Sequence, residues 1–251
     1  MLGISPPSFQ NGSDLDYGTV PRPVDGAYLA SLRLIKIYLL EKDFKKALTE
    51  ADAALKAFPN EDEIKRIHAL LLADLGKTTQ AVSEMRALLG GEKDRETHLD
   101  IASIYKRAQD YTEMEKSLQL AEKLSKTEEE QEVVSFQRAD AYAFRMRKYE
   151  EAEAEYRKIL KANPGSARAL NNLGYMLAER NVRLQEAREL ISRALEAEPQ
   201  TGAYLDSMGL VCDRLGKLDE AETYLRRAWE NSGPNPVIAE HWPMSISRKA
   251  T

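Results

Sequence analysis

The sequence lacks the features that mark secreted and membrane-spanning proteins. Its 251 residues include a single cysteine, Cys212, which excludes an internal disulfide and fits a reducing compartment. No run of about 18 apolar residues occurs, so we predict no transmembrane helix. The N-terminal stretch lacks a basic region followed by an apolar one, and we expect no signal peptide. These absences favour a cytoplasmic location for the chain as given; a periplasmic location is the alternative if it is part of a longer exported protein.

Excess positive charge and catalytic motifs are also missing. The chain has 36 Lys and Arg against 41 Asp and Glu, a net charge of −5, so we expect no nucleic-acid partner. His68, His98 and His241 show no metal-binding spacing, and there is neither a glycine-rich phosphate loop nor a GxSxG motif. We therefore predict no enzyme activity, no cofactor and no metal. Cys212 and His68 fall at packing positions, where a buried inert thiol and a buried histidine are expected.

Proline and glycine divide the chain into three parts. Both are frequent before residue 27. No proline occurs between Pro59 and Pro164, and prolines are frequent again from Pro234 onwards. Because proline interrupts helices, the long middle part is predicted to be helical. We predict a flexible arm over residues 1–27, a body over 28–235, and a truncated capping helix with a tail over 236–251.

The body contains a repeat of about 34 residues. Each copy has a turn, a polar or acidic pair, a small residue, and further small or apolar residues four and seven places on. The residues at the first small position are Ala47, Ala81, Ala152, Ala187 and Ala221, and in the third copy Met114 replaces the alanine. Each copy is predicted to form two helices that approach closely at these small residues. The predicted units span residues 28–61, 62–94, 95–132, 133–166, 167–201 and 202–235.

These residues resemble the tetratricopeptide repeat. The fifth unit has Leu173-Gly174, Ala187, Ala194 and Pro199 at the motif positions, and residues 171–229 are similar to uncharacterised bacterial tetratricopeptide proteins. The resemblance implies an all-α fold, a right-handed α-α superhelix of about six helix pairs. It also implies a non-catalytic protein-interaction module, in which first helices line a concave groove that binds a peptide or a partner helix.

The repeat positions predict which side chains line that groove. The candidates are Arg66, Lys106, Gln137, Arg138, Arg145, Asn171, Asn172, Tyr175, Asp206 and Arg214. Two of them, Asn171 and Asn172, carry amides that can pair with a peptide backbone. The basic residues of unit four, together with Lys106, Arg107 and Arg168, are predicted to form a basic strip suited to an acidic segment. The alternative is a solvated face whose charges have salt-bridge partners.

Two further predictions concern the partner. Only Asn172 matches the residues with which chaperone-binding members of the resembled family hold a chaperone tail, so such a tail is not expected. The alternative to groove binding is an assembly scaffold that acts through its ends or convex face. Because solenoids need polar caps at their ends, this alternative includes an end-to-end homo-oligomer.

Overall fold

The structure of the protein is a computed structural model that describes residues 26–232. Of the arm predicted over residues 1–27, only Gly26 and Ala27 are described, and they begin the first helix. The capping helix and tail predicted over residues 236–251 lie outside the described residues.

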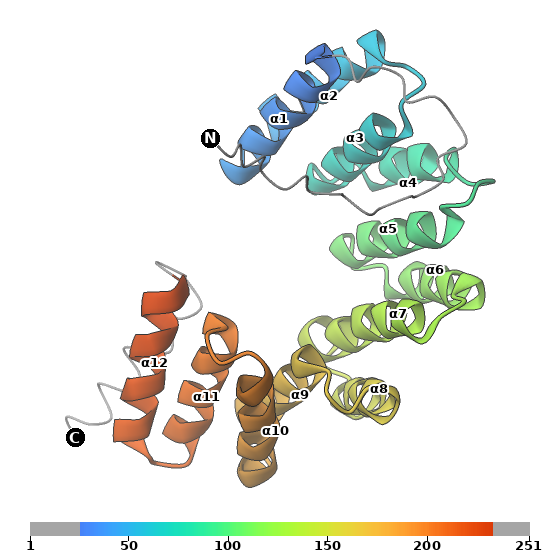
Figure 1. Ribbon diagram of the computed structural model, residues 1–251. Coiled ribbons are helices and arrows are strands. Elements are labelled where there is room, and N and C mark those ends of the chain that lie inside the picture. Colours follow the sequence, from blue (N-terminus) through green and yellow to red (C-terminus); the bar gives the residue numbers. More distant parts are fainter. Residues whose placement is uncertain (1–25, 233–251) are drawn as a thin grey trace, which may run out of the picture. The chain divides into compact units, whose positions relative to one another are not determined.

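Within residues 26–232 the structure contains twelve α-helices, one π turn and no strand (Figure 1). This confirms the predicted all-α class with about six consecutive helix pairs. The elements are α1 (Gly26–Leu40), α2 (Phe44–Ala57), α3 (Asp62–Asp74), α4 (Thr78–Arg86), α5 (Asp94–Arg107), α6 (Tyr111–Leu124), α7 (Glu128–Ala141), η1 (Tyr142–Met146), α8 (Tyr149–Ala162), α9 (Ala167–Glu179), α10 (Leu184–Ala197), α11 (Gly202–Arg214) and α12 (Leu218–Ser232).

The chain divides into two compact units between Lys77 and Thr78. Among the described residues, the first unit holds α1 to α3 and the second holds α4 to α12. In the first unit, Ile35 of α1, Ala47 and Ala51 of α2, and Leu71 of α3 form one buried cluster. The second helix of this unit therefore packs against both of its neighbours.

Local sequence explains where several helices begin. The Asp43 and Asp110 side chains accept hydrogen bonds from the backbone N–H groups of residues 46 and 113 and so cap α2 and α6. At α7, Thr127 and Glu130 form a capping box, in which each side chain bonds the backbone of the other. The acidic stretch Glu128–Glu132 thus begins a helix, where negative charge is favourable.

The small residues of the repeat lie where paired helices cross. Five of the six predicted small residues are alanines that are fully buried, and the sixth, Met114, is buried as well. At Gly174 in α9, an added Cβ would lie 2.6 Å from Ile191 Cγ1 and 2.9 Å from the Ala187 carbonyl oxygen of α10. The predicted need for small residues at these crossings is confirmed.

The fourth unit departs from the repeat at the π turn η1. The backbone N–H of Arg147 bonds the Tyr142 carbonyl five residues back, and this wider turn places an extra residue in the helix. Arg147 itself ends the turn with a left-handed φ of 55°. Side chains before the turn are therefore displaced by one repeat position.

Candidate functional site

The centre of the candidate site is Asp140, on α7 in the second unit. Its Oδ1 accepts hydrogen bonds from Tyr156 Oη of α8 (2.7 Å) and Asn172 Nδ2 of α9 (3.3 Å), and its Oδ2 accepts one from Arg168 Nη2 (3.2 Å). Burial, followed by the charge of Asp140, raises the pKa of Tyr156, which keeps the phenol protonated as a donor. Asp140 therefore joins α7, α8 and α9.

Three cations surround this single carboxylate. Burial lowers the pKa of Lys106, on α5; the charge of Asp140 opposes that effect, whereas the charges of Arg107, Arg145 and Arg168 add to it. Lys106 therefore lies within electrostatic reach of Asp140, Arg145 and Arg168, and Arg168 also bonds Asp140 directly. We call these four residues the basic cluster. It carries a net positive charge in a protein whose net charge is −5.

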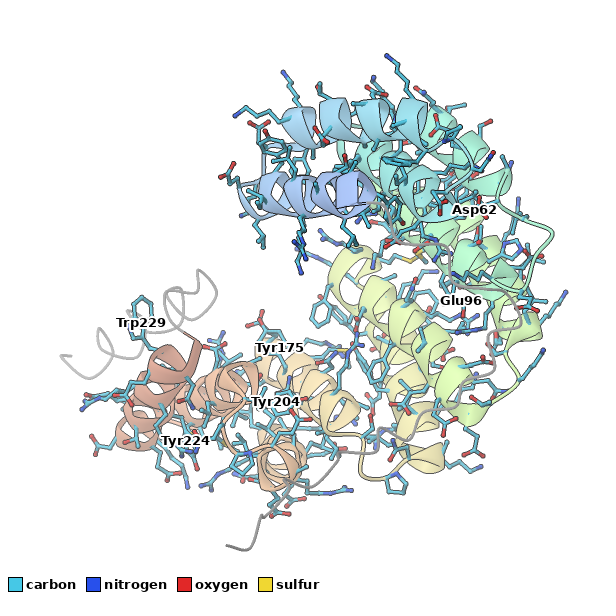
Figure 2. All side chains as sticks on the ribbon, turned by 45° about the horizontal axis from the view of Figure 1, so that its top comes forward. Asp62, Glu96, Tyr175, Tyr204, Tyr224 and Trp229 are labelled. Atoms are coloured by element: carbon cyan, nitrogen blue, oxygen red, sulfur yellow. The ribbon has the colours of Figure 1, made fainter. Side chains whose placement is uncertain are left out.

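Aromatic side chains lie beside the basic cluster. The Arg168 guanidinium lies over the Phe136 ring, 4.1 Å from its centroid. Phe144, within η1, is 48% exposed, and its ring centroid lies 6.1 Å from that of Tyr175 on α9. Tyr175 is labelled in Figure 2. The π turn thus presents an exposed aromatic side chain next to a positively charged surface.

Arg138 was predicted to face the groove, and the structure corrects this prediction. The side chain is buried, with the residue 6% exposed, and its guanidinium bonds three carboxylates: Glu115 (3.1 Å), Glu122 (2.9 Å) and Glu155 (3.4 Å). The cause is the extra residue in η1, which shifts Arg138 from the position of Asn172 to that of the buried Leu173. For Arg138 the alternative, a charge with salt-bridge partners, is therefore what the structure has.

The two asparagines of α9 differ in their positions. Asn172 is half-buried, and its amide donates to Asp140, so it supports the basic cluster. Asn171 is buried; it donates to Asn172 Oδ1 (3.4 Å), and its own Oδ1 is buried without a hydrogen-bond partner. Asn171 was predicted to present its amide at the groove surface, but the structure buries it.

The remaining predicted residues are spread over several helices. Gln137 on α7 is half-buried, and Arg145 in η1 is exposed. On α11, Asp206 is buried and Arg214 is half-buried, whereas Arg66 lies half-buried on α3 of the other unit. The structure thus brings together Lys106, Arg145, Asn172 and Tyr175 of the predicted set.

Three residues of the site were missed in the predicted groove set: Asp140, Phe144 and Tyr156. Once one residue is added for η1, Asp140 takes the repeat position of Tyr175, which was predicted to face the groove. Only knowledge of the π turn supplies that correction. The hydrogen bond from the buried Tyr156 to Asp140 has no sequence signal.

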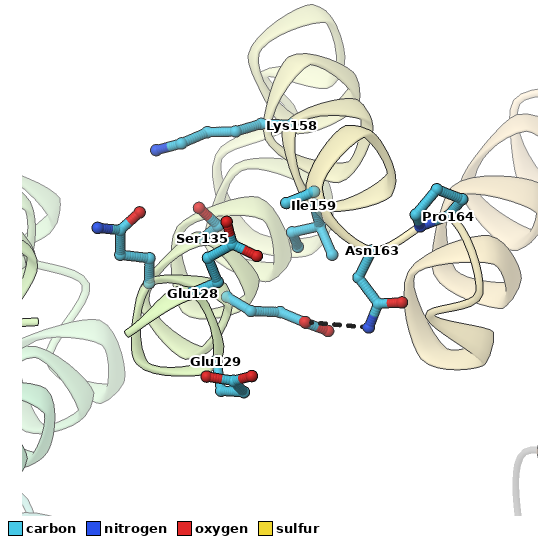
Figure 3. Close-up of a pocket in the computed structure, with 10 residues that line it drawn as sticks. Glu128, Glu129, Ser135, Lys158, Ile159, Asn163 and Pro164 are labelled. Atoms are coloured by element: carbon cyan, nitrogen blue, oxygen red, sulfur yellow. Dashed lines mark hydrogen bonds between the residues drawn. The ribbon is translucent and has the colours of Figure 1, made fainter. Parts of the chain in front are cut away.

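A separate cavity of about 310 Å³ lies between the start of α7 and the end of α8 (Figure 3). It is lined by Glu128, Glu129, Gln131, Glu132, Ser135, Lys158, Ile159, Ala162, Asn163 and Pro164. Glu132 accepts hydrogen bonds from Ser166 Oγ (2.8 Å) and Asn163 Nδ2 (3.4 Å), and Lys158 bonds Glu122 (2.9 Å). Its carboxylates would repel an acidic ligand, so this cavity does not extend the basic cluster.

The residues with intrinsic chemistry are held in structural roles. Burial raises the pKa of the Cys212 thiol to about 11, and His68 is buried with its Nε2 3.0 Å from Asp52 Oδ1, so both predicted packing positions are confirmed. In the part of the chain that the structure describes, no group of three or more His, Cys, Asp or Glu could hold a metal ion. None of the helices between residues 26 and 232 has the length and apolar character needed to cross a membrane.

Sequence comparison relates part of the chain to known proteins. Residues 141–202 and 183–236 match the profile of the tetratricopeptide repeat family. Over 89 residues the chain is 46% identical to a TPR repeat-containing protein of Pseudomonas aeruginosa. That alignment covers 36% of this chain and 15% of the relative, so the matched region is a small part of that longer protein.

Solved structures extend the similarity to most of the chain. A tetratricopeptide repeat protein from Parabacteroides merdae has a TM-score of 0.66 at 16% identity, with 89% of this chain and 86% of that chain covered. The Pseudomonas aeruginosa protein PilF has a TM-score of 0.56 at 17% identity, with 86% and 96% covered. At these identities the likeness shows the fold, and it confirms the predicted α-α superhelix.

Proposed function

Because residues 141–236 match the tetratricopeptide repeat family and the described helices share the fold of solved tetratricopeptide repeat proteins, we propose that the chain is a non-catalytic interaction module of that family that binds an acidic peptide segment. The family fold is generally a protein-interaction module. The binding surface is formed by the first helices α5, α7 and α9 and is centred on the basic cluster. Its partner is a protein whose bound segment carries Asp, Glu or a terminal carboxylate.

The observation that carries this proposal is the charge imbalance of the basic cluster. Lys106, Arg145 and Arg168 share one carboxylate, Asp140, which already accepts three hydrogen bonds. Burial lowers the pKa of Lys106 despite the opposing charge of Asp140, and the charges of Arg107, Arg145 and Arg168 lower it further, so an added anion would relieve an existing electrostatic cost. A carboxylate ligand would gain charge-assisted hydrogen bonds at this surface.

The neighbouring aromatic side chains add a second recognition element. Phe144 is exposed and packs against Tyr175, which offers an apolar contact for a peptide side chain. A peptide with an aromatic residue beside its carboxylates would use both elements.

The alternative is an assembly scaffold that acts through the ends of the repeat array. One observation favours it: several large apolar side chains of α1, the first described helix, are exposed.

The test is a calorimetric titration with a short synthetic peptide of Asp and Glu residues and one central Phe. We expect the double variant Lys106→Gln with Arg145→Gln to weaken binding about tenfold or more, and added salt to weaken it further. The matched control is Lys123→Gln with Lys161→Gln, two exposed lysines of the second helices α6 and α8. Equal weakening by both double variants, or tight binding of the same peptide with Asn and Gln in place of Asp and Glu, would show the proposal to be wrong.

A further inference from the structure

The first helices of the repeat can be aligned on the turns that end them. Each turn contains a residue with positive φ: Lys42, Gly76, Gln109, Arg147, Asn181 and Gly216. Five residues before this position stand Ile37, Leu71, Ile104, Met176 and Val211, and in the fourth unit, where η1 adds one residue, Ala141. These six residues are therefore equivalent.

Five of the six equivalent residues are buried, and for two of them the structure shows packing against the preceding second helix. Leu71 packs with Ala47 and Ala51 of α2, and Ala141 packs in a cluster with Met114 and Leu118 of α6. The other three are at most 2% exposed. Ile37 of α1 is the exception, at 49% exposed. In this repeat, the residue five places before the turn therefore contacts the second helix of the preceding unit.

The exposed apolar surface of α1 exceeds what the repeat itself requires. Leu40 is 75% exposed, and at its position, two residues before the turn, four of the other units carry Asp74, Arg107, Glu179 and Arg214. At about 100° per residue, Leu29, Ile37 and Leu40 lie on one side of the helix together with Arg33 and Lys36. We call these five residues the α1 face. An apolar residue where other units carry a charge points to a contact at this face.

The charges of the α1 face indicate the kind of partner. Residues 26–40 contain Arg33 and Lys36 and no acidic residue. A symmetric contact between two copies of α1 would bring these cations together, which is unfavourable. A helix with carboxylates beside its apolar stripe would pair with them instead.

We propose that the α1 face is a docking site for an amphipathic helix of a partner protein, with an Ala- and Leu-type stripe flanked by Asp or Glu. The same contact recurs within this chain, where second helices cover the equivalent position of the next first helix. One of them, α8, shows the required chemistry: Ala152, Tyr156 and Ile159 are buried, and Glu150 and Glu151 lie in its first turn. The site is distinct from the basic cluster, and it binds a helix rather than an acidic peptide segment.

The test uses a fluorescein-labelled synthetic peptide with the sequence of residues 149–166 as the helical probe, which has four glutamates against three Lys and Arg, and fluorescence anisotropy with the full chain. The test variant is Ile37→Ser with Leu40→Ser. The matched control is Leu120→Ser with Leu124→Ser, which replaces two exposed leucines of α6. Circular dichroism of both double variants checks that helix content is unchanged. A second peptide carries Gln in place of its four N-terminal glutamates, Glu150, Glu151, Glu153 and Glu155.

We expect the test variant to weaken binding of the probe about tenfold or more, the control to leave it unchanged, and the Gln peptide to bind more weakly. No measurable binding, or equal binding by test variant and control, would overturn the proposal. Light scattering of the full chain provides a second readout. A dimer that the Ile37→Ser and Leu40→Ser changes abolish would also overturn it, because the occupant would then be a second copy.

Discussion

Arg138 provides the sharpest prediction about what stabilises the fold. Its guanidinium joins Glu115 and Glu122 of α6 to Glu155 of α8, and the side chain is almost fully buried. Burial opposes the charged form, but hydrogen bonds to Glu122 and Glu115 raise the pKa of Arg138 nevertheless. We therefore expect Arg138→Met, which keeps an apolar stem, to leave three neighbouring carboxylates without their shared partner.

The magnitude follows from the burial of the group. Removing one partner of a buried ion pair costs about 3–5 kcal/mol. The three carboxylates are 27%, 35% and 17% exposed, so solvent screens part of this cost, and we expect about 2–3 kcal/mol at pH 7. Urea unfolding monitored by circular dichroism measures the loss. The control, Arg226→Met, removes a surface pair with Glu222 (2.7 Å) and should cost less than about 1 kcal/mol.

The pH dependence distinguishes a charge effect from a packing effect. Although burial alone would raise the pKa of Glu122, hydrogen bonds from Lys158 and Arg138 lower it. Stabilisation from a lowered carboxyl pKa is present above the unfolded value and is lost as the pH falls through the folded value. The free-energy difference between wild type and Arg138→Met should therefore shrink from pH 7 to pH 3. A difference that stays constant with pH, or one no larger than that of the control, would refute the reasoning.

Three shorter predictions address other parts of the chain. Gly174→Ala should cost about 2 kcal/mol of unfolding free energy, because its Cβ would clash with α10; Gly165→Ala, whose nearest atom would be 3.8 Å away, should cost much less. Hydrogen bonds, chiefly from Arg183, lower the pKa of Glu153 to about 2. In urea unfolding, Glu153→Gln should therefore lower the unfolding free energy by about 1–2 kcal/mol at pH 7 and by almost nothing near pH 2. Cys212, with its pKa raised to about 11, should react with iodoacetamide far more slowly in the native protein at pH 7 than in urea; equal rates would contradict its burial.

The fold was predictable because its main requirement is periodic. Most helix crossings of the repeat carry a small residue, and at the crossing of α9 and α10 the 2.6 Å approach of Ile191 to an added Cβ at Gly174 demonstrates why. That requirement recurs about every 34 residues, so alanines such as Ala152 and Ala187 reveal it in the sequence. Repetition therefore made the helix pairs visible without any knowledge of individual contacts.

The site was predictable only in part, because its geometry depends on a departure from the period. The π turn at Tyr142–Met146 displaces Arg138 into the protein interior and places Asp140 among the cations. An extra residue in the sequence fits equally well in a loop or in a helix, and the choice depends on local packing. Lys106 and Arg145 were predicted as members of one basic strip, whereas Asp140, which bonds α8 and α9, was not predicted.

The most direct test of the central claim is hydrogen exchange of the full chain with and without the acidic, Phe-containing peptide. The account predicts slower exchange in α5, α7 and α9 on peptide addition, with α6, α8 and α10 unchanged. Slowing confined to the second helices α6, α8 and α10 while the peptide is bound would contradict it.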